Sequence, residues 1–188
     1  MARPRSEDKR NAIMAGASRM IAAQGLSAPT ATIAQEAGVS NGSLFTYFET
    51  KADLLNQLYL ELKAGLVSAT LEGLPVRGEL RDQVFHIWVN WMGWVLSNPE
   101  KRRTLAQLDV SDEITQASRA AAYKTSAGIR KLLERTRANG PMRDAPMGFV
   151  MEIMNSLADA TVDFMANDPT NAGKHCKTGF DAFWRVLA

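Results

Sequence analysis

Residues 30–55 of the chain read TATIAQEAGVSNGSLFTYFETKADLL, and this stretch has the spacing of a helix-turn-helix. Gly38 supplies the turn, because glycine accepts the positive φ that such turns often need. Leu44 and Phe48 stand four residues apart, so they share the inner face of a short second helix. The other side of that helix carries small, hydrogen-bonding and aromatic residues: Gly42, Ser43, Phe45, Thr46 and Tyr47. This composition is expected of a helix that enters a major groove and touches base edges and phosphates.

Apolar residues recur at helical spacing along almost the whole chain, and no run alternates as a strand does. The sequence therefore predicts an all-α fold of about nine helices. One long helical segment is expected from Asp112 to Thr136, where the next glycine and proline stop it. The residues placed to cap helices are Thr30, Ser40, Thr50 and Asp112.

The motif resembles the DNA-binding signature of the TetR family of bacterial transcriptional repressors. The positions that match are Ile33-Ala34, Ala37-Gly38-Val39-Ser40, Gly42, Leu44-Phe45, Tyr47-Phe48, Lys51 and Leu54. With the preceding helix, the resemblance covers about 50 residues of the chain. One departure is Phe45, where the family usually has tyrosine. The change removes a hydroxyl that family members can use on the DNA backbone, so either the affinity for the backbone is lower or the ring serves by contact with a thymine methyl.

The resemblance implies a DNA-binding domain in residues 1–50 and a ligand-binding and dimerisation domain in residues 51–188. The expected DNA contacts, from the motif and the resemblance together, are Thr30, Ser40, Asn41, Gly42, Ser43, Phe45, Thr46, Tyr47 and Lys51. Lys51 is expected to pair with a phosphate at the start of a helix, where the helix dipole also favours an anion. For Thr30 and Ser40, helix capping alone is an equally good interpretation. Arg3 and Arg5 have two possible interpretations, a basic arm that contacts DNA or a simply disordered terminus.

The charge distribution agrees with this placement, although the net charge of +2 is too small to indicate a nucleic-acid partner. The first 51 residues hold six basic and four acidic side chains, and the remaining residues hold sixteen of each. The positive excess therefore lies in the part of the chain that carries the motif, where phosphate binding benefits from it.

Three tryptophans, Trp88, Trp91 and Trp94, fall within seven residues of one expected helix. Such a density exceeds what packing needs and predicts a cavity for a flat or apolar molecule, although a plain core is the alternative. The expected lining is Phe85, Trp88, Trp91, Met92, Val95 and Met154. Without a charge cluster on this stripe, the expected effector is apolar or aromatic.

The last two expected helices carry apolar stripes that the resemblance assigns to a homodimer, as a four-helix bundle with two helices from each subunit. The expected interface residues are Val150, Ile153, Leu157, Phe180, Phe183 and Trp184.

The sequence has few residues that are suited to catalysis or metal binding. His175 and Cys176 are adjacent, so on a helix they point about 100° apart and need a further partner to act as base and nucleophile. Only one other histidine, His86, is present, and no metal-ligand cluster is apparent. No enzyme activity, cofactor or metal is expected.

A single cysteine excludes an intrachain disulfide framework and fits a reducing compartment. The N-terminal residues lack the apolar segment of a secretory signal, and no stretch reaches the roughly 20 apolar residues of a spanning helix. A cytoplasmic protein is expected.

These features predict a repressor that binds a palindromic operator as a homodimer and is released by a small-molecule effector. The alternative is a helical small-molecule-binding protein whose N-terminal helices contact protein rather than DNA.

Overall fold

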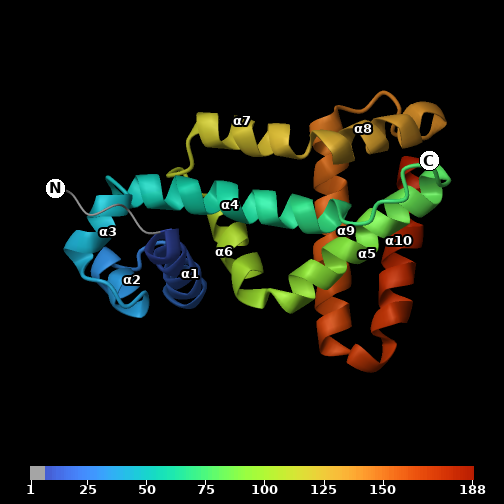
Figure 1. Ribbon diagram of the computed structural model, residues 1–188. Coiled ribbons are helices and arrows are strands. Elements are labelled where there is room, and N and C mark those ends of the chain that lie inside the picture. Colours follow the sequence, from blue (N-terminus) through green and yellow to red (C-terminus); the bar gives the residue numbers. More distant parts are fainter. Residues whose placement is uncertain (1–6) are drawn as a thin grey trace. The chain divides into compact units, whose positions relative to one another are not determined.

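The computed structural model describes residues 7–188, which form ten α-helices and two short 3-10 helices without a strand (Figure 1). The first six α-helices are α1 (Glu7–Gln24), α2 (Thr30–Glu36), α3 (Asn41–Tyr47), α4 (Lys51–Leu71), α5 (Leu80–Ser97) and α6 (Pro99–Asp109). The others are α7 (Gln116–Thr125), α8 (Ala127–Thr136), α9 (Met147–Asn167) and α10 (Ala172–Leu187), with 3-10 turns η1 (Arg137–Asn139) and η2 (Pro169–Asn171). The predicted all-α fold is confirmed. Arg3 and Arg5, the expected arm, lie outside the described residues.

The chain forms two compact units. The first comprises the described part of Met1–Ala64 together with Asn98–Tyr123, and the second comprises Gly65–Ser97 and Lys124–Ala188. The first unit thus holds all of α1–α3 and adds the first part of α4, with α6 and most of α7. Helix α4 contributes residues to both units.

The first unit has its own apolar core. Helix α1 packs against α2 and α6, and α2 packs against α3. The side chains that meet there are fully buried: Ile13, Ile21, Ile33, Leu44 and Phe48. Helices as short as α2 and α3 have too few internal hydrogen bonds to be stable alone, so this packing holds them in place.

Helix α1 approaches α2 closely at Gly16. A Cβ at this position would lie 3.2 Å from both the Ile33 carbonyl oxygen and the Ala37 nitrogen. A side chain there would push the two helices apart. Gly16 therefore sets the distance between the supporting helix and the helix-turn-helix.

Helix α6 joins the first unit through buried hydrogen bonds to α1. Thr104 is fully buried, and its hydroxyl donates to the Ser18 carbonyl at 2.7 Å. Gln107 Nε2 donates to the Ile21 carbonyl at 3.1 Å. Buried polar groups are costly unless paired, so these bonds fix the position of α6 on α1.

The core of the second unit lies among α5, α8, α9 and α10. Helices α9 and α10 pack along each other, and Figure 1 shows them side by side. Fully buried members of this core include Trp88, Leu133, Val150, Phe183 and Leu187. The core is therefore rich in large side chains contributed by all four helices.

The predicted single helix from Asp112 to Thr136 is divided in the structure. Helix α7 ends at Thr125, and α8 begins after Ser126. Serine competes for local hydrogen bonds, and the Ser126 hydroxyl accepts one from Arg130 Nη1 at 2.7 Å. The two helices also belong mainly to different units, so their buried faces serve different cores.

The predicted caps divide into two groups. Ser40 and Thr50 accept hydrogen bonds from the nitrogens of Ser43 and Asp53, at 3.1 and 3.0 Å, which confirms both. Thr30 does not cap α2, because Pro29 takes the N-cap position and Thr30 is the first helical residue. For α7, the residue that caps is Thr115 rather than Asp112, with the Ser118 nitrogen donating to its hydroxyl at 3.1 Å.

Candidate functional site

The turn between α2 and α3 is built around Gly38, whose φ is +67°. The following nitrogen, that of Val39, donates to the Ala34 carbonyl at 2.9 Å and closes the end of α2. A left-handed residue at this point is the usual way to end a helix, and glycine adopts it without a Cβ clash. The sequence therefore fixes the angle at which α3 leaves α2.

Helix α3 is divided into an inner and an outer face. Leu44 and Phe48, immediately after the helix, are fully buried. The exposed positions are Asn41, Gly42, Phe45 and Thr46, while Ser43 and Tyr47 are half-buried. The Phe45 side chain is 42% exposed. The predicted recognition residues thus lie mainly on one solvent-facing side.

Ser40 and Thr30 differ in how their hydroxyls are engaged. The Ser40 oxygen accepts the cap hydrogen bond at the start of α3, and its own proton stays available for donation. Thr30 makes no side-chain hydrogen bond within residues 7–188 and does not cap α2.

Lys51 is the first residue of α4, and no carboxylate of residues 7–188 lies within ion-pair distance of it. The start of α4 is held by a reciprocal cap. The Asp53 nitrogen donates to the Thr50 hydroxyl at 3.0 Å, and the Glu49 nitrogen donates to the Asp53 carboxylate at 3.1 Å. These two hydrogen bonds order the backbone that carries Lys51.

Arg10 is a supporting residue that the sequence pattern does not reveal. Its guanidinium donates to Glu61 at 3.1 Å and to Gln57 at 3.2 Å, and it lies over the Phe48 ring at 5.9 Å from the centroid. It therefore ties α1 to α4 across the end of α3. Since its partners are 47 and 51 residues away along the chain, no local motif indicates them.

A small polar groove of about 350 Å³ lies beside Tyr47. Its other lining residues are Thr46, Glu49, Asp53 and Gln57. Two of these carry carboxylates, which repel phosphate. This side of α3 is therefore unsuited to the DNA backbone, and the exposed side around Phe45 and Asn41 remains for it.

In the second unit, Trp88 belongs to the core. Its side chain is 1% exposed, its ring stacks on Phe183 with centroids 5.8 Å apart, and its Nε1 donates to the Cys176 carbonyl at 3.1 Å. The thiol of Cys176 is buried, and this burial raises its pKa. Neither face nor edge of Trp88 is left for a ligand.

The other residues of the expected cavity are placed mostly in the same core. Met92, Val95 and Met154 are buried there, and Trp91 is half-buried against it. Phe85 is 37% exposed and packs on Phe180, with ring centroids 4.7 Å apart. Four of the six expected lining residues therefore belong to the packed core of the second unit, and none of the six lines the groove described next.

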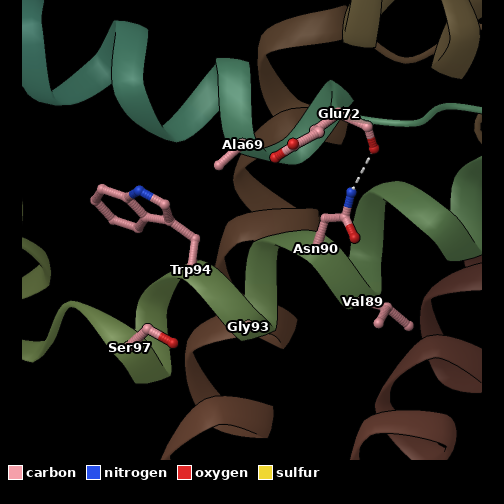
Figure 2. Close-up of a pocket in the computed structure, with 7 residues that line it drawn as sticks. All are labelled: Ala69, Glu72, Val89, Asn90, Gly93, Trp94 and Ser97. Atoms are coloured by element: carbon pink, nitrogen blue, oxygen red, sulfur yellow. Dashed lines mark hydrogen bonds between the residues drawn. The ribbon is translucent and has the colours of Figure 1, made fainter.

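A groove does exist on the neighbouring face of α5. It measures about 450 Å³, and Figure 2 shows the residues that line it. The lining residues are Ala69 and Glu72 from the end of α4, and Val89, Asn90, Gly93, Trp94 and Ser97 from α5. In the sequence, these α5 residues form a second set of positions three and four apart. The set that contains Trp88 is more apolar, so the sequence pattern favoured that set instead.

The expected dimer residues are also divided between the core and the surface. Val150, Phe180 and Phe183 are buried within the subunit, so they cannot meet a partner without repacking. Ile153, Leu157 and Trp184 are half-buried. A stripe along α9 continues from Ile153 and Leu157 to more exposed apolar residues: Phe149 at 57%, Phe164 at 65%, and Ala160 between them.

The helix-turn-helix with its solvent-facing α3 defines a DNA-binding domain. Residues 13–58 match the family model described as bacterial regulatory proteins, tetR family. The whole chain is similar to the structure of a TetR-family transcription regulator from Shewanella sp. PV-4, with 27% identity, a TM-score of 0.87, and coverage of 98% of this chain and 99% of that one. Residues 13–58 thus carry the DNA-binding segment of the TetR family, and nearly the whole chain has the fold of a TetR-family transcription regulator.

Two further structures share the fold. A TetR-family regulator from Marinobacter aquaeolei VT8 has 21% identity and a TM-score of 0.81, over 97% of this chain and 96% of that one. The TetR-like regulator LfrR from Mycobacterium smegmatis, solved in complex with proflavine, has 17% identity and a TM-score of 0.71, over 97% of this chain and 98% of that one.

In residues 7–188, none of the helices has both the length and the apolar content that crossing a membrane requires. Within the same residues, no three histidine, cysteine or acidic side chains are grouped so that they can hold a metal ion.

Proposed function

We propose that this regulator is a repressor that binds a palindromic operator as a homodimer in the cytoplasm, and that a small-molecule effector weakens this binding. The observation that carries the DNA part is the division of α3, where Asn41 and Thr46 are exposed while Leu44 and Phe48 are fully buried. A short helix held by its inner face presents its outer face to a major groove.

The exposed residues have different roles in this proposal. Asn41 and Thr46 read base edges, and the ring of Phe45 contacts a thymine methyl. Lys51, at the start of α4 and without a carboxylate partner among the described residues, binds a phosphate. Ser40 adds a phosphate contact through the proton that its cap hydrogen bond leaves available.

Thr30 and the flanks of α3 complete the proposed interface. Because Thr30 does not cap α2, its hydroxyl serves a phosphate rather than the helix end. Tyr47 and Ser43 are half-buried, so they contribute from the border of the surface. Gly42 is exposed, and a Cβ there would meet no atom within 4 Å, so its role is close approach to the DNA rather than packing.

The proposed dimer uses the outer stripe of α9. Phe149, Ile153, Leu157, Ala160 and Phe164 follow one another at three- and four-residue spacing, and the two phenylalanines are more than half exposed. A contiguous apolar face of this kind is typical of a protein interface. Two copies related by a two-fold axis bury it against each other, with α10 completing a four-helix bundle.

A symmetric dimer requires a symmetric operator. Its half-site centres are expected roughly 34–36 Å apart along the DNA, or a multiple of that distance. The test is selection of bound sequences from a random DNA pool, followed by mobility shifts on the selected site. Recovery of inverted repeats supports the proposal, whereas recovery of single asymmetric half-sites refutes DNA recognition by a dimer.

The effector part of the proposal rests on the fold and on a relative. LfrR, which shares the fold, was crystallised with proflavine, so a chain of this architecture accommodates a small molecule. An effector of this chain must bind the DNA-free form better than the DNA-bound form, and such coupling is typically about 1–3 kcal/mol. Helix α4 begins at Lys51 and ends at Leu71, beside the groove of the second unit, so it is the element through which the coupling runs.

The second candidate function is a binding protein whose N-terminal helices contact protein. A mobility shift with random duplex DNA at low salt separates the two. Phosphate binding without sequence specificity appears there for a DNA-binding protein and is absent for the alternative.

A further inference from the structure

The groove between the end of α4 and α5 has the size of a small-molecule site. Its volume of about 450 Å³ lies within the roughly 300–1,000 Å³ that such sites occupy. Figure 2 shows the Trp94 ring reaching from α5 towards Ala69, with the Glu72 side chain extending along α4 in the same direction. The ring and the carboxylate therefore face the same space.

The polar groups of the groove are hydrogen-bond acceptors. Within residues 7–188, neither the Glu72 carboxylate nor the Asn90 side-chain oxygen receives a hydrogen bond or an ion pair. The donor side of the Asn90 amide is already engaged, because its nitrogen donates to the Glu72 carbonyl at 2.9 Å. Ser97 adds a hydroxyl, and no lysine, arginine or histidine is among the lining residues. The groove therefore offers negative charge and acceptors to a ligand.

The apolar groups of the groove suit a flat ring. Trp94 is half-buried and packs against the core of the second unit. Next to it, Gly93 has no side chain, and a Cβ there would meet no atom within 4 Å. Val89, which is 41% exposed, lines the groove one turn before Gly93. A planar group can thus lie on the tryptophan without a steric obstacle from α5.

We infer that this groove binds an organic cation that carries a planar aromatic ring, with the ring on Trp94 and the positive charge directed to Glu72. A cation over an indole face is favourable, and the carboxylate adds a Coulombic attraction. An anion is repelled by Glu72, and an uncharged apolar molecule leaves the acceptors without a donor. This inference gives the effector of the proposed function a chemical class, and for that role it rests on the proposed function.

The binding test uses the full-length protein without DNA and isothermal titration calorimetry. The probe is 1-methylquinolinium, and the matched uncharged compound is quinoline at pH 8. The wild-type protein is expected to bind the cation at least tenfold more tightly than quinoline. Equal affinity for the two, or no detectable binding of the cation, overturns the inference.

Three variants assign the binding to the groove. Trp94→Leu is expected to weaken binding of the cation roughly 3- to 30-fold, with Trp94→Phe between it and the wild type, following the order of cation–π strength. Glu72→Gln is expected to weaken binding of the cation roughly 3- to 10-fold and to leave the affinity for quinoline unchanged. The control is Glu79→Gln, an exposed acid before the start of α5 that is not among the lining residues. An equal loss in Glu72→Gln and Glu79→Gln, or no loss in Trp94→Leu, refutes the site.

Gly93→Leu keeps the test independent of folding defects. The added side chain enters open space in the groove, and leucine favours a helix over glycine, so the variant is expected to keep its thermal stability. Its binding of 1-methylquinolinium is expected to be lost. Unchanged binding in a folded Gly93→Leu protein contradicts the inference.

Operator binding is then measured separately by mobility shift. A protein that binds its operator but not the cation refutes this inference and leaves the DNA part of the proposed function intact. A protein that binds the cation through Trp94 and Glu72, with operator affinity unchanged at saturation, supports the site and refutes its role as the effector site.

Discussion

The contact between α9 and α10 at Gly179 yields a prediction whose size follows from the structure. A Cβ built on Gly179 would lie 2.1 Å from the Thr161 hydroxyl oxygen, 3.0 Å from its methyl carbon and 3.1 Å from its Cβ. Rotating Thr161 relieves only part of this clash, because its Cβ does not move with the rotation. Its hydroxyl also donates to the Leu157 carbonyl at 2.7 Å, a hydrogen bond that rotation breaks. Gly179→Ala therefore forces the two helices apart.

Overpacking typically costs about 1–3 kcal/mol, and three contacts this short place Gly179→Ala in the upper half of that range. Alanine regains about 1 kcal/mol over glycine within a helix. The net loss in free energy of unfolding is expected to be about 1–2 kcal/mol, which lowers Tm by roughly 2–8 °C for a chain of this size. Gly173→Ala in the same helix is the control, because its Cβ meets no atom within 4 Å.

Urea unfolding at a fixed protein concentration measures these changes, since the stability of a dimer depends on concentration. The decisive variant is the double mutant Thr161→Ala/Gly179→Ala, in which the hydroxyl and methyl that clash are absent. In the Thr161→Ala background, Gly179→Ala is expected to cost less than about 0.5 kcal/mol, so the two substitutions couple by about 0.5–2 kcal/mol. Strictly additive losses, or a wild-type midpoint for Gly179→Ala alone, refute the close approach of α9 and α10.

Three other variants test separate features. Lys51→Ala is expected to lower affinity about equally for all DNA sequences and to reduce the slope of log affinity against log salt concentration by about 1. Binding titrations at several salt concentrations measure this slope. An unchanged slope contradicts the assignment of Lys51 to a phosphate. Gly140→Ala places a Cβ 2.2 Å from the backbone oxygen of Leu187. In thermal unfolding, this variant is therefore expected to lose more stability than Gly179→Ala loses. An equal or smaller loss argues against this packing of the chain end. Burial, followed by the charge and hydrogen bond of Asp109, raises the pKa of Tyr59 to about 12 from an ordinary value of 10, so this phenol stabilises the fold below pH 10 and its contribution is lost as pH rises towards 12. An absorbance titration at 295 nm should show a step near pH 12 that Tyr59→Phe lacks; the same step in both proteins would rule out Tyr59 as its source.

The helix-turn-helix was predictable from the sequence because its determinants are local. The turn glycine Gly38, the inner residues Leu44 and Phe48, and the cap Ser40 lie within a few residues of each other, and each acts through backbone geometry or helical spacing. The all-α class followed for the same reason, since apolar periodicity reports the helix itself. The support from Arg10 was not predictable, because its partner Glu61 is 51 residues away.

The ligand and dimer surfaces depended on which neighbour covers which face of a helix. Helix α5 carries two sets of positions at helical spacing, and periodicity alone does not say which set is buried. The fold buries Trp88 against Phe183 and leaves Trp94 in a groove beside Glu72. On α9 it buries Val150 and exposes Phe164. A sequence thus determines that a helix has an apolar face, whereas the burial of each side chain is a property of the surrounding helices and is decided only when they pack.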